Sequence, residues 1–71
     1  MKQSEMKDFL TNKGINITKT EGDDFSSVFH ISNENRAKID ENRAEYEKET
    51  GLMMMTSNDF GMSVVIMENE E

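Results

Sequence analysis

The sequence predicts an α+β fold with the element order α-β-β-α-β-β, in which two helices lie beside a four-stranded antiparallel sheet. Two observations predict it. Apolar residues recur at helical spacing in two segments, and a glycine follows each segment, at Gly14 and Gly51. After each glycine come two short apolar segments, separated by residues typical of turns. Each half of the chain is therefore predicted to form a helix followed by a hairpin.

The first helix is predicted over residues 4–13. Met6, Phe9 and Leu10 are spaced so that they form one apolar stripe over two turns. Ser4 is the candidate N-cap, because its hydroxyl can accept a hydrogen bond from a free backbone N–H of the first turn.

The first hairpin is predicted from alternation and turn composition. Residues 15–18 alternate apolar and polar side chains, as a half-buried strand does, and residues 20–24 are typical of a turn. Residues 25–31 form the second predicted strand. Its predicted faces carry Phe25, Phe29 and Ile31 on one side, and Val28 and His30 on the other.

The second helix is predicted over residues 32–50, a segment without glycine that ends at Gly51. Ile39 and Tyr46 lie seven residues apart and define a narrow apolar stripe. Oppositely charged residues four positions apart predict three ion pairs along this helix: Glu34 with Lys38, Arg36 with Asp40, and Arg43 with Glu47.

The second hairpin is predicted from residues 52–55 and 62–67, around a turn at residues 57–59. Both of its faces are partly apolar, so more than one helix, or a second subunit, must cover it. One predicted face carries Phe60, Met62, Val64 and Ile66. The other is the predicted dimer interface: Met53, Met55, Val65 and Met67.

The two halves also share a weak sequence echo. Asp24, Phe25 and Ile31 recur 35 residues later as Asp59, Phe60 and Ile66, which favours a four-stranded antiparallel sheet with the helices on one face. Residues 1–67 are expected to form a single domain, and residues 68–71 an acidic C-terminal tail.

The chain is short and has no cysteine. With 71 residues it can form one domain only, and folding at this size buries roughly 60% of the surface that the unfolded chain exposes. Disulfide bonds and thiolate zinc sites are excluded as sources of stability. We therefore expect a homodimer, in which self-association compensates for the small core. The sequence shows no signal peptide or membrane span, so a cytoplasmic location is expected.

Few residues suit catalysis. His30, the only histidine, could act as a general base or pH switch, but on the predicted strand it is more typical of a partly exposed sheet residue. Glu21, Asp23 and Asp24 could offer oxygen ligands to a hard cation, but they lack the spacing of an EF-hand loop and are more typical of a solvated turn. We therefore predict no enzyme activity, no metal and no cofactor.

Charge is unevenly placed along the chain. Residues 1–19 have a net charge of +2, and the remaining residues sum to −9. Such a surface repels nucleic acid and anionic membranes and attracts basic proteins. The acidic residues predicted to bind a partner are Glu21, Asp23, Asp24, Glu34, Asp40, Glu41, Glu45 and Asp59.

In size, charge and layout, the whole chain resembles the small acidic host-takeover proteins encoded by bacteriophages. The resemblance is carried by acidic segments such as residues 34–37 (Glu-Asn-Arg-Ala) and Asp40-Glu41. Some proteins of this type are DNA mimics. The resemblance implies a non-enzymatic inhibitor that, in the host cytoplasm, occupies the nucleic-acid-binding surface of a basic bacterial protein. The first partner to test is an HU-like nucleoid-associated protein, and RNA polymerase or a nuclease is the next.

An alternative function depends on methionine instead of charge. Five of the seven methionines fall between residues 53 and 67. Flexible thioethers suit an adaptable binding surface, although they also fill cores. The alternative is therefore a small regulatory adaptor that binds a protein partner through the Met-rich C-terminal hairpin.

Overall fold

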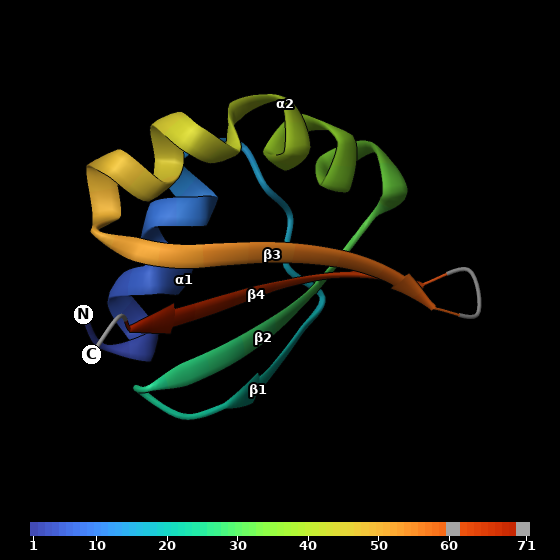
Figure 1. The fold of residues 1–71 in the computed structure, drawn as a ribbon. Coiled ribbons are helices and arrows are strands. Elements are labelled where there is room, and N and C mark those ends of the chain that lie inside the picture. The colour runs from blue at the N-terminus through green and yellow to red at the C-terminus, as the bar shows by residue number, and fades with distance from the viewer. Residues whose placement is uncertain (60–61, 70–71) are drawn as a thin grey trace.

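Six elements follow one another in the predicted order. The computed structural model describes residues 1–59 and 62–69. It shows an α+β fold with the elements α1 (Gln3–Asn12), β1 (Lys19–Gly22), β2 (Ser26–Ile31), α2 (Asn33–Thr50), β3 (Leu52–Asp59) and β4 (Met62–Asn69) (Figure 1). The predicted fold class and element order are confirmed.

The four strands form one antiparallel sheet in the order β1-β2-β4-β3. The two hairpins therefore join through β2 and β4, which are the central strands. α2 packs over β3 and β4, and α1 lies against β2 (Figure 1). All of the buried strand residues point to the side of the helices, so the sheet is covered on one face.

The core is built from alternate residues of the central strands. On β2 the buried residues are Ser27, Phe29 and Ile31, and on β4 they are Ser63, Val65 and Met67. From the helices come the residues that the helical spacing predicted: Met6 and Leu10 on α1, and Ile39 and Tyr46 on α2. Phe29 and Val65 are paired across the central strands, and both side chains are fully buried. This pair therefore lies at the centre of the core.

The two helices also contact each other directly. The rings of Phe9 and Tyr46 meet edge to face, with 5.5 Å between their centroids. Lys13, at the end of α1, lies over both rings, and its Nζ is 3.1 Å from a carboxylate oxygen of Glu49. These contacts fix the end of α1 against the last turns of α2.

The C-terminus of α1 explains why the predicted first strand is wrong. Gly14 has a φ of 84°, and the N–H of Ile15 donates to the carbonyl of Leu10 at 3.0 Å, which closes the helix with a Schellman motif. Ile15 is buried by this closure instead of entering the sheet. β1 therefore begins at Lys19, four residues later than predicted.

The N-terminus of α1 also differs from the prediction. The helix begins at Gln3, so Ser4 lies within the first turn and is not the N-cap. The N–H of Lys2 donates to Glu5 at 2.8 Å, and the N–H of Gln3 donates to Asp24 at 2.9 Å. A carboxylate of the β1–β2 turn thus caps the first helix, which ties α1 to the first hairpin.

α2 matches its predicted bounds closely. The hydroxyl of Ser32 accepts a hydrogen bond from the N–H of Asn35, and the helix ends at Thr50 with Gly51, whose φ is 72°, as its C-cap. Of the three predicted ion pairs, the structure forms the one between Arg36 and Asp40, at 3.9 Å. The other two are not formed. Glu47 instead accepts the backbone N–H of Met54 in β3 at 3.0 Å.

The second hairpin is longer than predicted. Residues 57–59 are not a turn, because β3 continues through Asp59 and Ser57 pairs with Val64. Glu68 and Asn69 belong to β4 and not to a tail. Phe60 and residues 70–71 lie outside the described residues.

The sequence echo at an offset of 35 does not correspond to equivalent positions in the two hairpins. Ile31 points into the core, whereas Ile66 lies on the opposite face of the sheet. Side chains alternate between the two faces along each strand, and the buried residues of β2 and β4 all have odd numbers. Two residues of these strands that are separated by an odd offset therefore lie on opposite faces of the sheet. Paired residues such as Phe29 and Val65 share a face and are separated by 36 positions.

The buried position of Phe29 makes a prediction about stability. Phe29→Ala should cost about 3–5 kcal/mol, which is about the whole stability expected of so small a core. We expect the variant to be largely unfolded at about 25 °C, as measured by circular dichroism and urea titration. Phe25→Ala is the matched control. Phe25 is 55% exposed, and its loss should change the free energy of unfolding by about 0.5 kcal/mol or less. Equal effects of the two substitutions would contradict this description of the core.

Candidate functional site

The eight acidic residues predicted to bind a partner do not form one surface. Four lie on α2, one on β1, and two in the turn between β1 and β2. Asp59 ends β3, and its side chain lies outside the described residues. The β1–β2 hairpin and α2 lie at opposite sides of the view (Figure 1). A single partner surface therefore cannot include all of these residues.

Glu21 on β1 is bound by two neighbouring side chains, His30 and Lys19. Its carboxylate lies 2.7 Å from Nε2 of His30 and 3.6 Å from Nζ of Lys19. The hydrogen bond with His30, followed by the positive charge of Lys19, lowers the pKa of Glu21 below its ordinary value. The charge of Glu21 thus serves a local cluster on the sheet.

Asp23 and Asp24 stabilise the fold. Asp23 accepts hydrogen bonds from the backbone N–H groups of Phe25 and Ser26, both at 2.9 Å, and these bonds lower the pKa of its carboxyl. Asp24 caps α1 through Gln3. Both carboxylates are exposed, but each already has donors within the chain.

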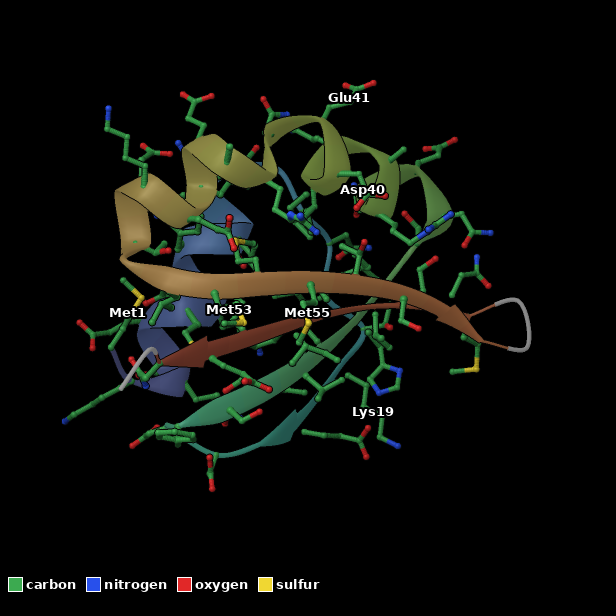
Figure 2. All side chains as sticks on the ribbon, viewed as in Figure 1. Met1, Lys19, Asp40, Glu41, Met53 and Met55 are labelled. Atoms are coloured by element: carbon green, nitrogen blue, oxygen red, sulfur yellow. The ribbon has the colours of Figure 1, made fainter. Side chains whose placement is uncertain are left out.

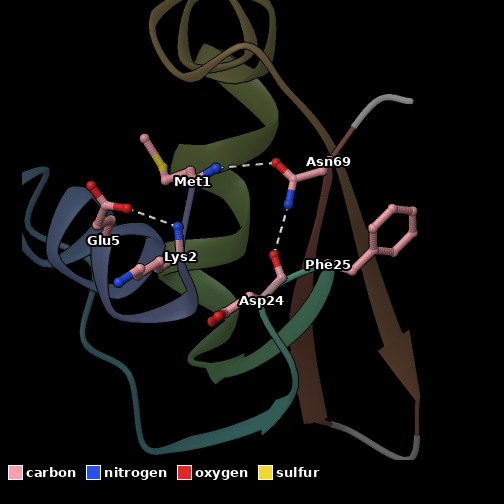
Figure 3. A pocket seen from close by; sticks show the side chains of 6 residues that line it. All are labelled: Met1, Lys2, Glu5, Asp24, Phe25 and Asn69. Atoms are coloured by element: carbon pink, nitrogen blue, oxygen red, sulfur yellow. Dashed lines mark hydrogen bonds between the residues drawn. The ribbon is translucent and has the colours of Figure 1, made fainter.

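A shallow hollow of about 360 Å³ lies beside this turn (Figure 3). The polar groups that line this hollow form hydrogen bonds with groups of the chain itself. The N-terminal amino group donates to the side chain of Asn69 at 3.3 Å, and the amide of Asn69 donates to the carbonyl of Asp24 at 2.7 Å. Glu5 accepts from the backbone of Lys2. These groups are occupied in holding the termini and the turn together.

Three carboxylates on α2 differ from the others. Glu34, Glu41 and Glu45 are exposed, and within the described residues none of them makes an ion pair or a hydrogen bond. Glu41 points away from the sheet (Figure 2). Asp40 does not belong with them, because it pairs with Arg36 and accepts the hydroxyl of Thr56 on β3. We call Glu34, Glu41 and Glu45 the carboxylate row.

Helical geometry aligns the carboxylate row. The steps of seven and four residues keep its members on one face, about 10 Å and about 6 Å apart along the helix axis. Lys38 lies between Glu34 and Glu41 in the sequence, but its Nζ donates to the carbonyl of Lys13 at the end of α1. This bond directs the charge of Lys38 toward α1 and leaves the carboxylate row without an internal cation.

The second candidate surface is the uncovered side of the sheet, which we call the open face. Cross-strand register places on it Lys19, Glu21, Ser26, Val28, His30, Met53, Met55, Ser57, Met62, Val64, Ile66 and Glu68. Val28, Ile66 and Met55 form one line across three strands. Six of these described side chains are apolar, and three of them are methionines with exposed fractions of 40% to 57%.

The predicted dimer interface is wrong in two of its four residues. Met53 and Met55 lie on the open face (Figure 2), but Val65 and Met67 are fully buried against the helices. The register pairs Met54 with Met67, so Met67 shares the face of Met54. Periodicity shows which residues of one strand share a face, but it does not show how two strands align. In the sequence, the open face was indicated by the apolar residues at every second position, Met62, Val64 and Ile66.

His30 lies on the open face and is partly exposed, with Glu21 as its neighbour. Its other ring nitrogen, Nδ1, is buried and has no partner among the described residues. Among all the residues that the structure describes, no three histidine, aspartate or glutamate side chains converge as a metal site would require. Neither helix of the described ranges is long and apolar enough to cross a membrane.

The role of Asp23 makes a prediction about pH. Its lowered pKa means that the folded state binds fewer protons than the unfolded state in acid, so this contribution to stability is present above the ordinary carboxyl range and is lost as the pH falls. Asp23→Asn keeps a side-chain oxygen to accept the same hydrogen bonds but cannot titrate. The melting temperature of the variant should therefore fall less between about pH 5 and about pH 3 than that of the original chain.

The matched control for this prediction is Asp8→Asn. Asp8 is an exposed carboxylate of α1, and it makes no hydrogen bond or ion pair within the described residues. The control removes the same charge and leaves the turn intact. If Asp23→Asn and Asp8→Asn give the same dependence of melting temperature on pH, the turn is not the source of the effect.

No protein-family model, curated protein or solved structure matches this chain. Residue roles therefore rest on the side chains of the chain itself. Two surfaces remain after the locally compensated acids are set aside: the carboxylate row on α2, and the open face of the sheet.

Proposed function

We propose that the protein is a non-enzymatic inhibitor that binds a basic, nucleic-acid-binding protein of a bacterial cell through the carboxylate row. Carboxylates at fixed spacing interact with the Lys and Arg side chains that would otherwise hold phosphates. The mechanism is competition: while the inhibitor is bound, the nucleic acid cannot occupy the same basic groups.

The observation that supports this proposal is the contrast among the acidic residues. Glu21, Asp23, Asp24 and Asp40 all have donors within the chain. The carboxylate row is exposed and has none among the described residues. Its members can therefore accept donors from another molecule without first losing an internal bond, whereas the other four would have to exchange one partner for another.

The strength of the carboxylate row limits what it can do. An exposed ion pair contributes about 0.2–1 kcal/mol, so three such pairs supply about 0.6–3 kcal/mol and not a complete binding energy. The net charge of −7 adds a long-range attraction for a basic partner, which mainly raises the rate of association. We therefore expect binding that weakens strongly with salt.

An HU-like nucleoid-associated protein is the first partner to test, because its basic arms bind the minor groove without sequence selectivity. The assay measures displacement of a fluorescent DNA duplex from purified HU-like protein at about 50 and about 200 mM salt. We expect displacement at low salt that decreases at high salt. RNA polymerase and nucleases are tested in the same format if the HU-like protein does not bind.

Charge reversal localises the effect. Glu41→Lys should weaken displacement by about fivefold, because it removes one attraction and adds one repulsion. Asp8→Lys is the matched control: it changes the net charge equally, but on α1 and outside the carboxylate row. Equal losses for the two variants would show that net charge alone acts, and this would overturn the proposed role of the carboxylate row.

A broader experiment tests the class of partner. The tagged chain is used to capture proteins from a bacterial lysate, and the captured proteins are identified by mass spectrometry. We expect a basic DNA- or RNA-binding protein that is lost when Glu34, Glu41 and Glu45 are all changed to Lys. Capture of no nucleic-acid-binding protein, or capture that the triple change leaves intact, contradicts the proposed function.

A further inference from the structure

We infer that the open face is a homodimer interface, in which a second copy of this chain packs its own open face against the first. The two sheets would form a sandwich with the helices on the outside. This inference is independent of the proposed function, because it concerns the side of the sheet opposite to the helices.

The first argument is the chemistry of the open face. Val28, Val64 and Ile66 are half-buried at its centre, on the two middle strands. Met53 and Met55 extend this apolar area along β3, each with 40% of its surface exposed. Adjacent apolar side chains on one face of a sheet are normally covered, and larger exposed patches mark interaction sites.

The second argument is charge. The described side chains of the open face carry a formal charge of −1, from Lys19, Glu21 and Glu68, whereas the full chain carries −7. The carboxylate row lies on the outer side of α2, across the core from the open face. Two acidic copies therefore meet with the least repulsion when their open faces are in contact, and their carboxylate rows are then far apart.

The third argument is area. The four strands contain 26 residues, and each strand residue occupies about 16 Å² of the plane of a sheet. Two facing sheets thus cover about 800 Å² in projection. Protruding side chains raise the accessible area toward the roughly 1,000 Å² that a specific interface needs. The open face is thus large enough for a small dimer.

Pairing through the sheet edges is disfavoured. On β3, the N–H groups of Leu52 and Met54, at the start of the strand, are already bonded, to Thr50 at 3.2 Å and to Glu47 at 3.0 Å. The other edge, β1, has four residues, which include Lys19 and Glu21. Short, charged or covered edges disfavour addition of another strand. These edges therefore favour face-to-face packing as the mode of self-association.

The methionines provide built-in probes for the test. Met53, Met55 and Met62 lie on the open face, whereas Met6, Met54 and Met67 are buried in the core. With ¹³C-methyl-labelled methionine, NMR spectra are recorded from about 1 mM to about 10 µM protein. We expect the methyl signals of Met53 and Met55 to shift on dilution and those of the three core methionines to stay unchanged.

Sedimentation of two variants completes the test. Met55→Glu places a charge in the proposed interface and should weaken dimerisation by about tenfold or more. Ala44→Glu adds the same charge at an exposed position of α2 and should leave dimerisation unchanged. Circular dichroism of both variants distinguishes a loss of dimer from a loss of structure, and we expect both variants to be folded.

Two outcomes would overturn the inference. Either the chain is monomeric at about 1 mM, or it dimerises and Met55→Glu has no effect. If the chain is monomeric and Met55→Glu abolishes binding to a different protein captured from lysate, the open face is the site of an adaptor. Because none of these measurements involves the carboxylate row, failure of the dimer and failure of the proposed inhibition are distinguishable.

Discussion

The packing of the central strands against the two helices, with Phe29 and Val65 at its centre, determines how the layers and the outer surfaces of the molecule are arranged. A chain of 71 residues can cover only one side of a four-stranded sheet with two helices of this length. The core therefore lies on one side, and the apolar residues of the other side are left at the surface. Both candidate surfaces follow from this arrangement, because the outer side of α2 and the open face are the two outer surfaces of the same two layers.

Local electrostatics decides which acidic residues are available to a partner. At the β1–β2 turn, Asp23 accepts backbone N–H groups within the turn, and Asp24 accepts one from the start of α1. A helix N-terminus carries free N–H donors and a partial positive charge, so a nearby carboxylate is stabilised there. These two acids hold the first helix to the first hairpin. Most of the formal charge of the turn is thus used for folding. Among the acidic residues predicted to bind a partner whose side chains the structure describes, those left without an internal donor are Glu34, Glu41 and Glu45 on the outer side of α2.

The separation of charge from apolar surface has a consequence for assembly. If two copies join through their open faces, the two carboxylate rows lie on opposite outer sides of a four-layer assembly. Such a dimer presents two equivalent acidic surfaces to basic partners. Two-point binding increases apparent affinity when both sites can engage, which compensates for the small contribution of each exposed ion pair.

The α+β class, the order of the elements and the bounds of α2 were predictable from the sequence, because they depend on local periodicity and on caps such as Ser32 and Gly51. The sequence also placed Ile39 and Tyr46 in the core. Other features depend on contacts that form in the folded chain, including contacts between residues that are far apart in the sequence. Ile15 closes α1 and does not start a strand, because its N–H donates to the carbonyl of Leu10 in the Schellman motif. Strand pairing places the methionines on opposite faces of the sheet. Met54 pairs with Met67 on the face that the helices cover, and Met55 pairs with Ile66 on the open face. Strand register and long-range capping join residues far apart in the chain, and no local pattern records which distant partner a residue will meet.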